Sequence, residues 1–123
     1  MSQSTLDTNR VARLLLQDSV PTLGERAAAE VIRLAANYEA LGQEWIDDGL
    51  SVADAQRSAD QYFVDALQQT AHDLFWDPTW PACPLHPRHP LWYEVNSDAW
   101  WYHQDRQAIA PLGALANIRP SAS

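Results

Sequence analysis

One cysteine and three histidines lie close together in the C-terminal half of the chain, and they are the residues best suited to chemistry. Cys83, His86, His89 and His103 include the only cysteine and three of the four histidines. A Cys-x2-His element before a hairpin, with another histidine at the hairpin's far end, resembles half of a zinc ribbon. In a zinc ribbon, ligands at the two ends of the hairpin bind one tetrahedral ion. The sequence thus offers Cys83, His86 and His103 as zinc ligands, with His89 as a candidate fourth.

The residues between these ligands argue against a compact metal site. Five prolines recur at every third position: Pro78, Pro81, Pro84, Pro87 and Pro90. Such a tract favours a polyproline II rod, in which successive ligands would lie roughly 9 Å apart, too far to share one ion. Pro87 also follows His86 directly, where a metal-binding knuckle usually has a glycine that permits positive φ. We therefore expect no cofactor, and zinc is the alternative.

Short segments of this region resemble a group of small uncharacterised bacterial proteins. The segments are CPLH, HPLW and AWWYH, followed by APLGAL. In those proteins a C-P-x-H or C-P-x-C element precedes a tryptophan-rich hairpin and a closing apolar-glycine segment. The resemblance covers about residues 80–115 and implies a degenerate zinc ribbon with no known activity. Arg106 departs from the pattern, since it stands where a partner ligand of His103 is expected and cannot bind a metal.

Cys83 could alternatively be a catalytic nucleophile. It would need His86 or His103 as a base, oriented by Asp98 or Asp105. A reactive thiol also needs a positive environment that lowers its pKa, which the flanking prolines and aromatic residues do not supply. We therefore expect a non-enzymatic protein in which Cys83 is structural.

Apolar residues at helical spacing predict two successive helices in the N-terminal part of the chain. The first covers residues 5–19, after a Ser4/Thr5 cap, and Pro21 ends it. A capping box of Thr22 and Glu25 then starts the second helix, which continues to about residue 47.

A third helix is predicted after the turn at Asp48-Gly49. It begins with a capping box of Ser51 and Asp54 and ends near Phe75. The short connection makes the second and third helices an antiparallel hairpin, which the first helix covers to give a three-helix bundle. The alternative is that part of the seam stays open and two copies of the chain form a four-helix dimer.

The character of the sequence changes after the third helix. Eight of the twelve aromatic residues fall within residues 75–102. Residues 91–95 and 99–103 are rich in strand-forming types and predict a hairpin with a three-residue loop, and residues 109–112 could add a third strand. We thus predict one mainly α-helical domain over residues 1–123. Its parts are a helical region (5–76), a polyproline-like arm (77–90), a β-hairpin region (91–115) and a flexible tail (116–123).

Composition narrows the classes of partner. The formal net charge of −8 disfavours nucleic acid, and no apolar run is long enough for a membrane span, so we expect a cytoplasmic protein. Tryptophan is more abundant than so small a core requires, and it concentrates binding energy at interfaces. We therefore expect a protein-protein interaction or accessory subunit, or a homo-oligomer. The tract could instead strap its own bundle. The expected contact residues are Trp76, Trp80, Trp92, Trp100 and Trp101.

Overall fold

The chain folds into three helices followed by a small sheet, as a computed structural model of the protein shows for residues 6–74, 79–86, 88–102, 104 and 106–115. The elements are α1 (Asn9–Leu23), α2 (Glu25–Asp47), α3 (Val52–Leu74), β1 (Trp92–Glu94), β2 (Ala99–Tyr102) and β3 (Gln107–Pro111). In this part of the chain no helix is both long and apolar enough to cross a membrane.

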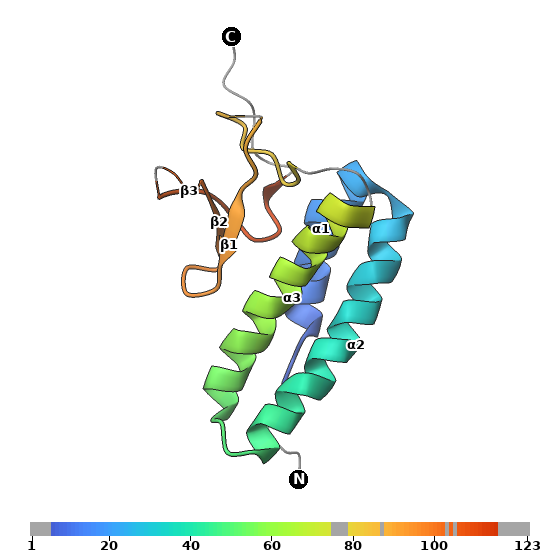
Figure 1. The fold of residues 1–123 in the computed structure, drawn as a ribbon, viewed down its shortest axis with the longest axis vertical. Helices are drawn as coiled ribbons and strands as arrows, with labels where there is room; N and C mark the ends of the chain where they lie inside the picture. Colours follow the sequence, from blue (N-terminus) through green and yellow to red (C-terminus); the bar gives the residue numbers. More distant parts are fainter. Residues whose placement is uncertain (1–5, 75–78, 87, 103, 105, 116–123) are drawn as a thin grey trace.

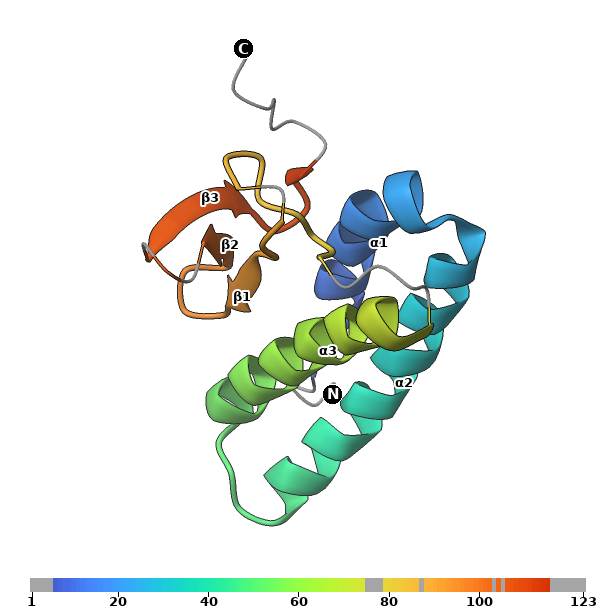
Figure 2. The same ribbon diagram turned by 45° about the horizontal axis from the view of Figure 1, so that its top comes forward.

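The helices form a bundle and the sheet lies against one side of it. α2 and α3 run antiparallel over most of their length, and α1 lies beside both (Figure 1). The sheet lies against α1 and α3, on the side away from α2, as a second view confirms (Figure 2). The mainly helical fold with a bundle and a C-terminal hairpin is therefore as predicted.

The core of the bundle follows the helical spacing of the sequence. On α2, Ala27, Val31 and Leu34 are buried, and Val31 and Leu34 share one hydrophobic core with the fully buried Phe63 and Leu67 of α3. Steps of three and four residues place these side chains on one stripe of each helix. The stripe, and not local propensity, therefore holds α2 and α3 together.

The start of α3 was predicted correctly, whereas the start of α1 was not. The Ser51 hydroxyl accepts a hydrogen bond from the Asp54 amide at 3.1 Å, which is half of the predicted capping box. α1 begins at Asn9, four residues later than expected, because the Asp7 carboxylate accepts the Asn9 amide at 2.9 Å and satisfies the first free N–H. Residues 4 and 5, which were expected to cap α1, lie outside the described residues.

Pro21 does not end α1, contrary to the prediction. The helix continues to Leu23 and stops at Gly24, whose φ of 84° is left-handed. Proline fixes a φ that suits a helix, so in the last turn it costs mainly the hydrogen bond that its missing N–H would give to the carbonyl of Gln17. Gln17 itself lines a pocket.

The predicted capping box of Thr22 and Glu25 is also wrong. Gly24 is the N-cap of α2 and makes no side-chain cap. Thr22 belongs to α1, and its hydroxyl oxygen accepts a hydrogen bond from the Trp80 indole N–H at 3.0 Å. A residue expected to start one helix therefore anchors the proline tract to another.

The described part of the proline tract is a closed loop, and the prediction of a straight rod is wrong. The Cys83 amide donates to the His89 carbonyl at 3.0 Å, the Leu91 amide donates to the Pro81 carbonyl, and Ala82 and Pro90 form an antiparallel bridge. A polyproline rod has no internal hydrogen bonds, so it could not bury Cys83 and Leu91 without leaving backbone groups unpaired. Both residues are fully buried. The tract therefore packs on its own molecule, but as a loop.

The sheet has the strand order β1-β2-β3 and both pairs are antiparallel. A bulge interrupts the β2–β3 pairing next to Trp100 and Trp101. The predicted hairpin and third strand are confirmed, but the hairpin loop has four residues (95–98) and not the predicted three, so Glu94 pairs with Ala99. Asp98, at a φ of 53°, closes this turn.

Candidate functional site

The two faces of the sheet have different surroundings. Tyr93, Trp100 and Tyr102 point toward the bundle and are 5%, 0% and 4% exposed. Side chains alternate along a strand, so their neighbours Trp92 and Trp101 lie on the opposite face. The sheet therefore has a core face with three large aromatic residues and an outer face with two.

Trp100 is the centre of the core face. Its ring meets the Trp80 ring edge-on, with centroids 5.7 Å apart, and its indole N–H donates to the Asp18 carboxylate at 2.8 Å. Asp18 also accepts the amides of Gly113 and Leu115 at 2.7 and 3.0 Å. Trp80 and Trp100, both predicted to contact a partner, are thus used inside the fold.

The outer face carries a cross-strand tryptophan pair. Trp92 and Trp101 are direct partners in the β1–β2 register, and Trp92 remains 43% exposed. A pocket of about 190 Å³ lies beside them and is also lined by Glu94 and Arg106. We call Trp92, Glu94, Trp101 and Arg106 the indole face.

The two indoles are held by neighbouring side chains. The Trp101 N–H donates to the Ser97 hydroxyl at 2.7 Å, and the His72 ring meets Trp92 edge-on with centroids 6.4 Å apart. Arg106 has a φ of 52°, a left-handed conformation, at the turn that leads into β3. The two indoles of the indole face are therefore held by neighbouring side chains on two paired strands.

Glutamines of α3 close the edge of the sheet at β1. The Gln61 side chain donates to the Tyr93 carbonyl and accepts the Val95 amide, both at 2.9 Å. Two helical turns further along α3, the Gln68 side chain donates a hydrogen bond to the Leu91 carbonyl at 2.6 Å. These amide groups act as the next strand would. Strand addition at β1 is thereby blocked.

The β3 edge is short and interrupted. Pro111 ends the strand and has no N–H to donate, and the bulge distorts the pairing beside it. Prolines and bulges of this kind protect sheet edges from pairing with other chains. A partner would therefore meet the face of this sheet more readily than its edges.

The predicted metal ligands are only partly brought together. The His86 ring stacks on Tyr102, with centroids 4.2 Å apart, and His89 meets the same ring edge-on at 6.1 Å. Cys83 is fully buried, and His103 lies outside the described residues. Among the described residues no group of three or more histidine, cysteine or acidic side chains could hold a metal. Zinc binding stays a prediction.

A charged network joins the hairpin turn to the bundle. Arg10 pairs with Asp98 at 2.9 Å and lies 3.9 Å from Asp60. Tyr93 donates its hydroxyl to Asp98 at 2.8 Å. The hydrogen bonds from Arg10 and Tyr93 lower the pKa of Asp98 despite its partial burial, whereas burial raises the pKa of Asp60 to about 6. The network contains two carboxyl groups for one guanidinium.

The sequence identified two residues of the indole face and missed the other two. Trp92 and Trp101 were expected to contact a partner, while Trp76, expected to do the same, lies outside the described residues. Glu94 could have been found from the alternation of β1, since it lies two residues after Trp92. Arg106 was considered only as a failed metal ligand, and no signal in the sequence indicated its turn conformation.

Comparisons with protein-family models, with curated proteins and with solved structures returned no match. The function is therefore inferred from the geometry of the chain itself.

Proposed function

We propose that the protein is a non-enzymatic interaction module whose indole face binds an extended, proline-containing segment of a partner protein, flanked by a basic residue. The observation that carries this proposal is the cross-strand pair of Trp92 and Trp101 on the outer face, beside a pocket lined by Glu94 and Arg106.

Two indoles on neighbouring strands suit proline rings. Aromatic-lined grooves bind polyproline II segments because the rings stack on flat apolar surfaces and the segment is already extended, so little entropy is lost. Such a segment leaves its carbonyls unpaired. Arg106 is exposed at the same pocket and its guanidinium can donate to those carbonyls.

The charge of the protein favours a basic flank. Glu94 is exposed at the pocket, and the chain carries a formal net charge of −8. An acidic protein attracts basic segments over a distance of about one Debye length, roughly 8 Å at physiological salt. Glu94 would pair with the arginine or lysine once the segment is seated.

Peptide titration tests this proposal. The probes are a synthetic peptide with a proline-rich core and flanking arginines, the same peptide with its prolines replaced by alanine, and one with its arginines replaced by glutamate. Tryptophan fluorescence and calorimetry would report binding. We expect the first peptide to bind at least about tenfold more tightly than either control, since proline stacking and the charge pair each contribute on the order of 1 kcal/mol or more.

Two variants locate the binding. Trp92→Ala should weaken binding of the proline peptide about tenfold or more, because an exposed anchor is lost. Tyr62→Ala is the matched control, since Tyr62 is 54% exposed on α3 and is not part of the indole face. Equal affinity of all three peptides, or equal weakening by both variants, would contradict the proposal.

A further inference from the structure

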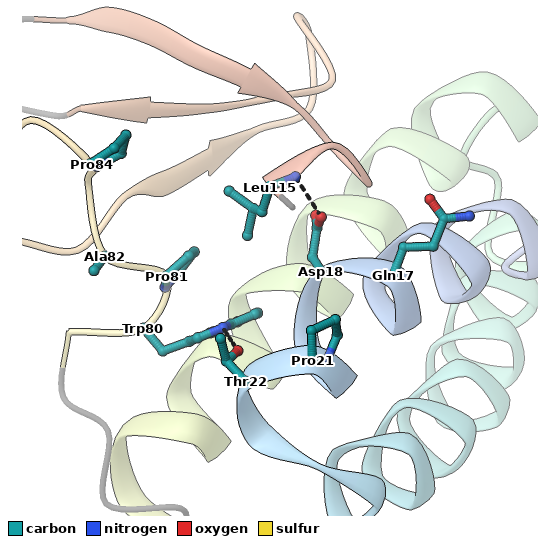
Figure 3. A pocket seen from close by; sticks show the side chains of 9 residues that line it. All are labelled: Gln17, Asp18, Pro21, Thr22, Trp80, Pro81, Ala82, Pro84 and Leu115. Atoms are coloured by element: carbon teal, nitrogen blue, oxygen red, sulfur yellow. Dashed lines mark hydrogen bonds between the residues drawn. The ribbon is translucent and has the colours of Figure 1, made fainter. Parts of the chain in front are cut away.

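A second pocket lies where the end of α1 meets the proline loop. It has a volume of about 230 Å³, and we call it the Trp80 pocket (Figure 3). Its lining residues are Gln17, Asp18, Pro21, Thr22, Trp80, Pro81, Ala82, Pro84 and Leu115. None of them belongs to the indole face.

The apolar walls of the Trp80 pocket are fixed in place. The Trp80 indole is 3% exposed, and its N–H is held by the Thr22 hydroxyl at 3.0 Å. The rings of Pro21 and Pro81 lie on the two sides of the pocket, one from α1 and one from the loop (Figure 3). The site is therefore built by rigid groups and does not depend on long flexible side chains.

The polar groups of this pocket include a buried carboxylate. The Asp18 side chain projects from α1 toward Leu115 (Figure 3), and the residue is only 3% exposed. Among the described residues, no ion pair with Asp18 is found. Its Oδ2 accepts the N–H groups of Trp100 and Gly113, whereas within the part of the chain that the structure describes its Oδ1 accepts only that of Leu115. Since each carboxylate oxygen can accept about two hydrogen bonds, Oδ1 retains capacity.

Further features of the lining favour a ligand that donates hydrogen bonds. Gln17 lines the pocket, and Pro21 one turn later has no N–H to give to the Gln17 carbonyl. No arginine, lysine or histidine is among the lining residues. Burial raises the pKa of Asp18 even though the three N–H donors oppose the shift, so the protein compensates this carboxylate only in part. A bound cation would complete that compensation.

We infer that the Trp80 pocket binds a small organic ammonium ion with an apolar body. Its ammonium group would donate to Asp18 Oδ1 and to the Gln17 carbonyl, and its apolar body would lie between the Trp80 indole and the proline rings. A cation near an indole face gains further attraction from the ring. The volume is below the roughly 300–1,000 Å³ of pockets for drug-sized ligands, so the ligand is small.

Three compounds of one shape test the charge of the ligand. Phenethylammonium, phenethyl alcohol and 3-phenylpropanoate share an apolar body and differ in the head group. We expect phenethylammonium to bind at least about tenfold more tightly than the alcohol, as a charge-assisted hydrogen bond would give, and the carboxylate not to bind. Calorimetry and tryptophan fluorescence at neutral pH would measure both affinities. Equal binding of the ammonium and the alcohol, or no binding of the ammonium at millimolar concentration, would overturn the inference.

Variants assign the binding to this pocket. Ala82→Leu enlarges an exposed side chain of the pocket lining without replacing the buried carboxylate, and it should abolish ammonium binding. Asp18→Asn should weaken it about tenfold or more where the variant folds. Trp92→Ala on the indole face should leave ammonium binding unchanged. Retained affinity in Ala82→Leu would show that the ammonium binds elsewhere and would overturn the assignment.

The two proposals fail independently. Ala82→Leu should bind the proline peptide as the parent protein does, since Ala82 is not part of the indole face. Loss of peptide binding without loss of ammonium binding would count only against the proposed function, and the reverse would count only against this pocket.

Discussion

The indole N–H of Trp100 donates to the carboxylate of Asp18 at 2.8 Å, across 82 positions of the sequence. Asp18 lies on α1 and Trp100 on β2, so this bond joins the first helix to the sheet. The same carboxylate receives two backbone amides from the segment after β3. A single buried side chain thus anchors both the middle and the end of the sheet to the bundle.

Asp18→Asn should destabilise the fold by about 2–4 kcal/mol. All three partners of Asp18 are N–H donors, so an amide NH₂ in place of either oxygen faces at least one donor and leaves it unpaired. Urea denaturation would measure the loss. Asp47→Asn is the control, because Asp47 is exposed and accepts a hydrogen bond from the exposed end of the Gln43 side chain on its own helix. A similar change in both variants would contradict the anchoring role.

Gln61→Ala should cost about 1–2 kcal/mol, since it removes two hydrogen bonds to the edge of β1. Amide hydrogen exchange is the more specific measurement, because it reports on individual backbone groups at the edge of β1. The Val95 amide, which Gln61 accepts, should exchange faster in the variant, while amides of α2 change little. Gln69→Ala is the matched control, since Gln69 is exposed and its side chain pairs with Asp73 on the same helix. Unchanged exchange at Val95 would show that Gln61 does not protect this edge.

The bundle and the hairpin could be predicted because local patterns determine them. Apolar residues spaced three and four positions apart predicted α2 and α3. The strand-forming runs on either side of Asn96-Ser97-Asp98 predicted the hairpin. The register was not predicted: a three-residue loop would pair Val95 with Ala99 and Trp92 with Tyr102, whereas the observed four-residue loop places Trp92 opposite Trp101. Trp92 and Trp101 could therefore be named from the sequence as contact residues, but their cross-strand pairing could not.

The proline tract and the end of α1 could not be predicted because distant contacts decide them. Each proline fixes its own φ, but the residues between prolines remain free to turn, and burial of Cys83 and Leu91 decides the path. Pro21 remains helical in the last turn of α1, where few hydrogen bonds remain to be lost. Asp18 looked like an ordinary charged residue on a helix, and only the assembled fold surrounds it with donors.

Cys83 should react slowly with iodoacetamide at neutral pH in the folded protein and quickly in denaturant, because its side chain is fully buried. Mass spectrometry would follow the modification. Fast alkylation of the folded protein would instead favour a cysteine nucleophile. Metal analysis of untagged protein examines the zinc alternative in the same samples, and one zinc per chain that is lost in Cys83→Ser would establish it.

Asp60 should make stability depend on pH. Burial is the main cause that raises its pKa to about 6, with Asp98 and Asp7 adding to the rise and the Gln56 hydrogen bond and Arg10 opposing it. The unfolded chain, with an ordinary Asp pKa near 4, binds fewer protons than the folded chain between about pH 4 and pH 6. The free energy of unfolding therefore falls through this group as the pH rises, by on the order of 2 kcal/mol.

Asp60→Asn isolates this contribution. Asparagine keeps an acceptor for Gln56 but cannot ionise, so the difference in unfolding free energy between the parent and the variant should change across that pH window. Urea denaturation at a series of pH values would measure the difference. Parallel curves for the two proteins would rule out Asp60 as the source. Below about pH 4 the depressed pKa of Asp98 acts with the opposite sign, and stability is lost as the pH falls.

Arg106→Gly should stabilise the protein and weaken its proposed binding at the same time. The left-handed φ of 52° costs a non-glycine residue on the order of 1 kcal/mol, which glycine avoids. The variant also removes the guanidinium from the indole face, so the proline peptide should bind about tenfold more weakly. Arg106→Asn is the comparison, because asparagine tolerates this conformation but lacks the fork of donors. Undiminished peptide binding by both variants would mean that Arg106 does not contact the peptide. If both variants bind the peptide equally weakly and Arg106→Gly gains more stability, the guanidinium is needed for binding. The strained backbone at this turn is then the cost of presenting it.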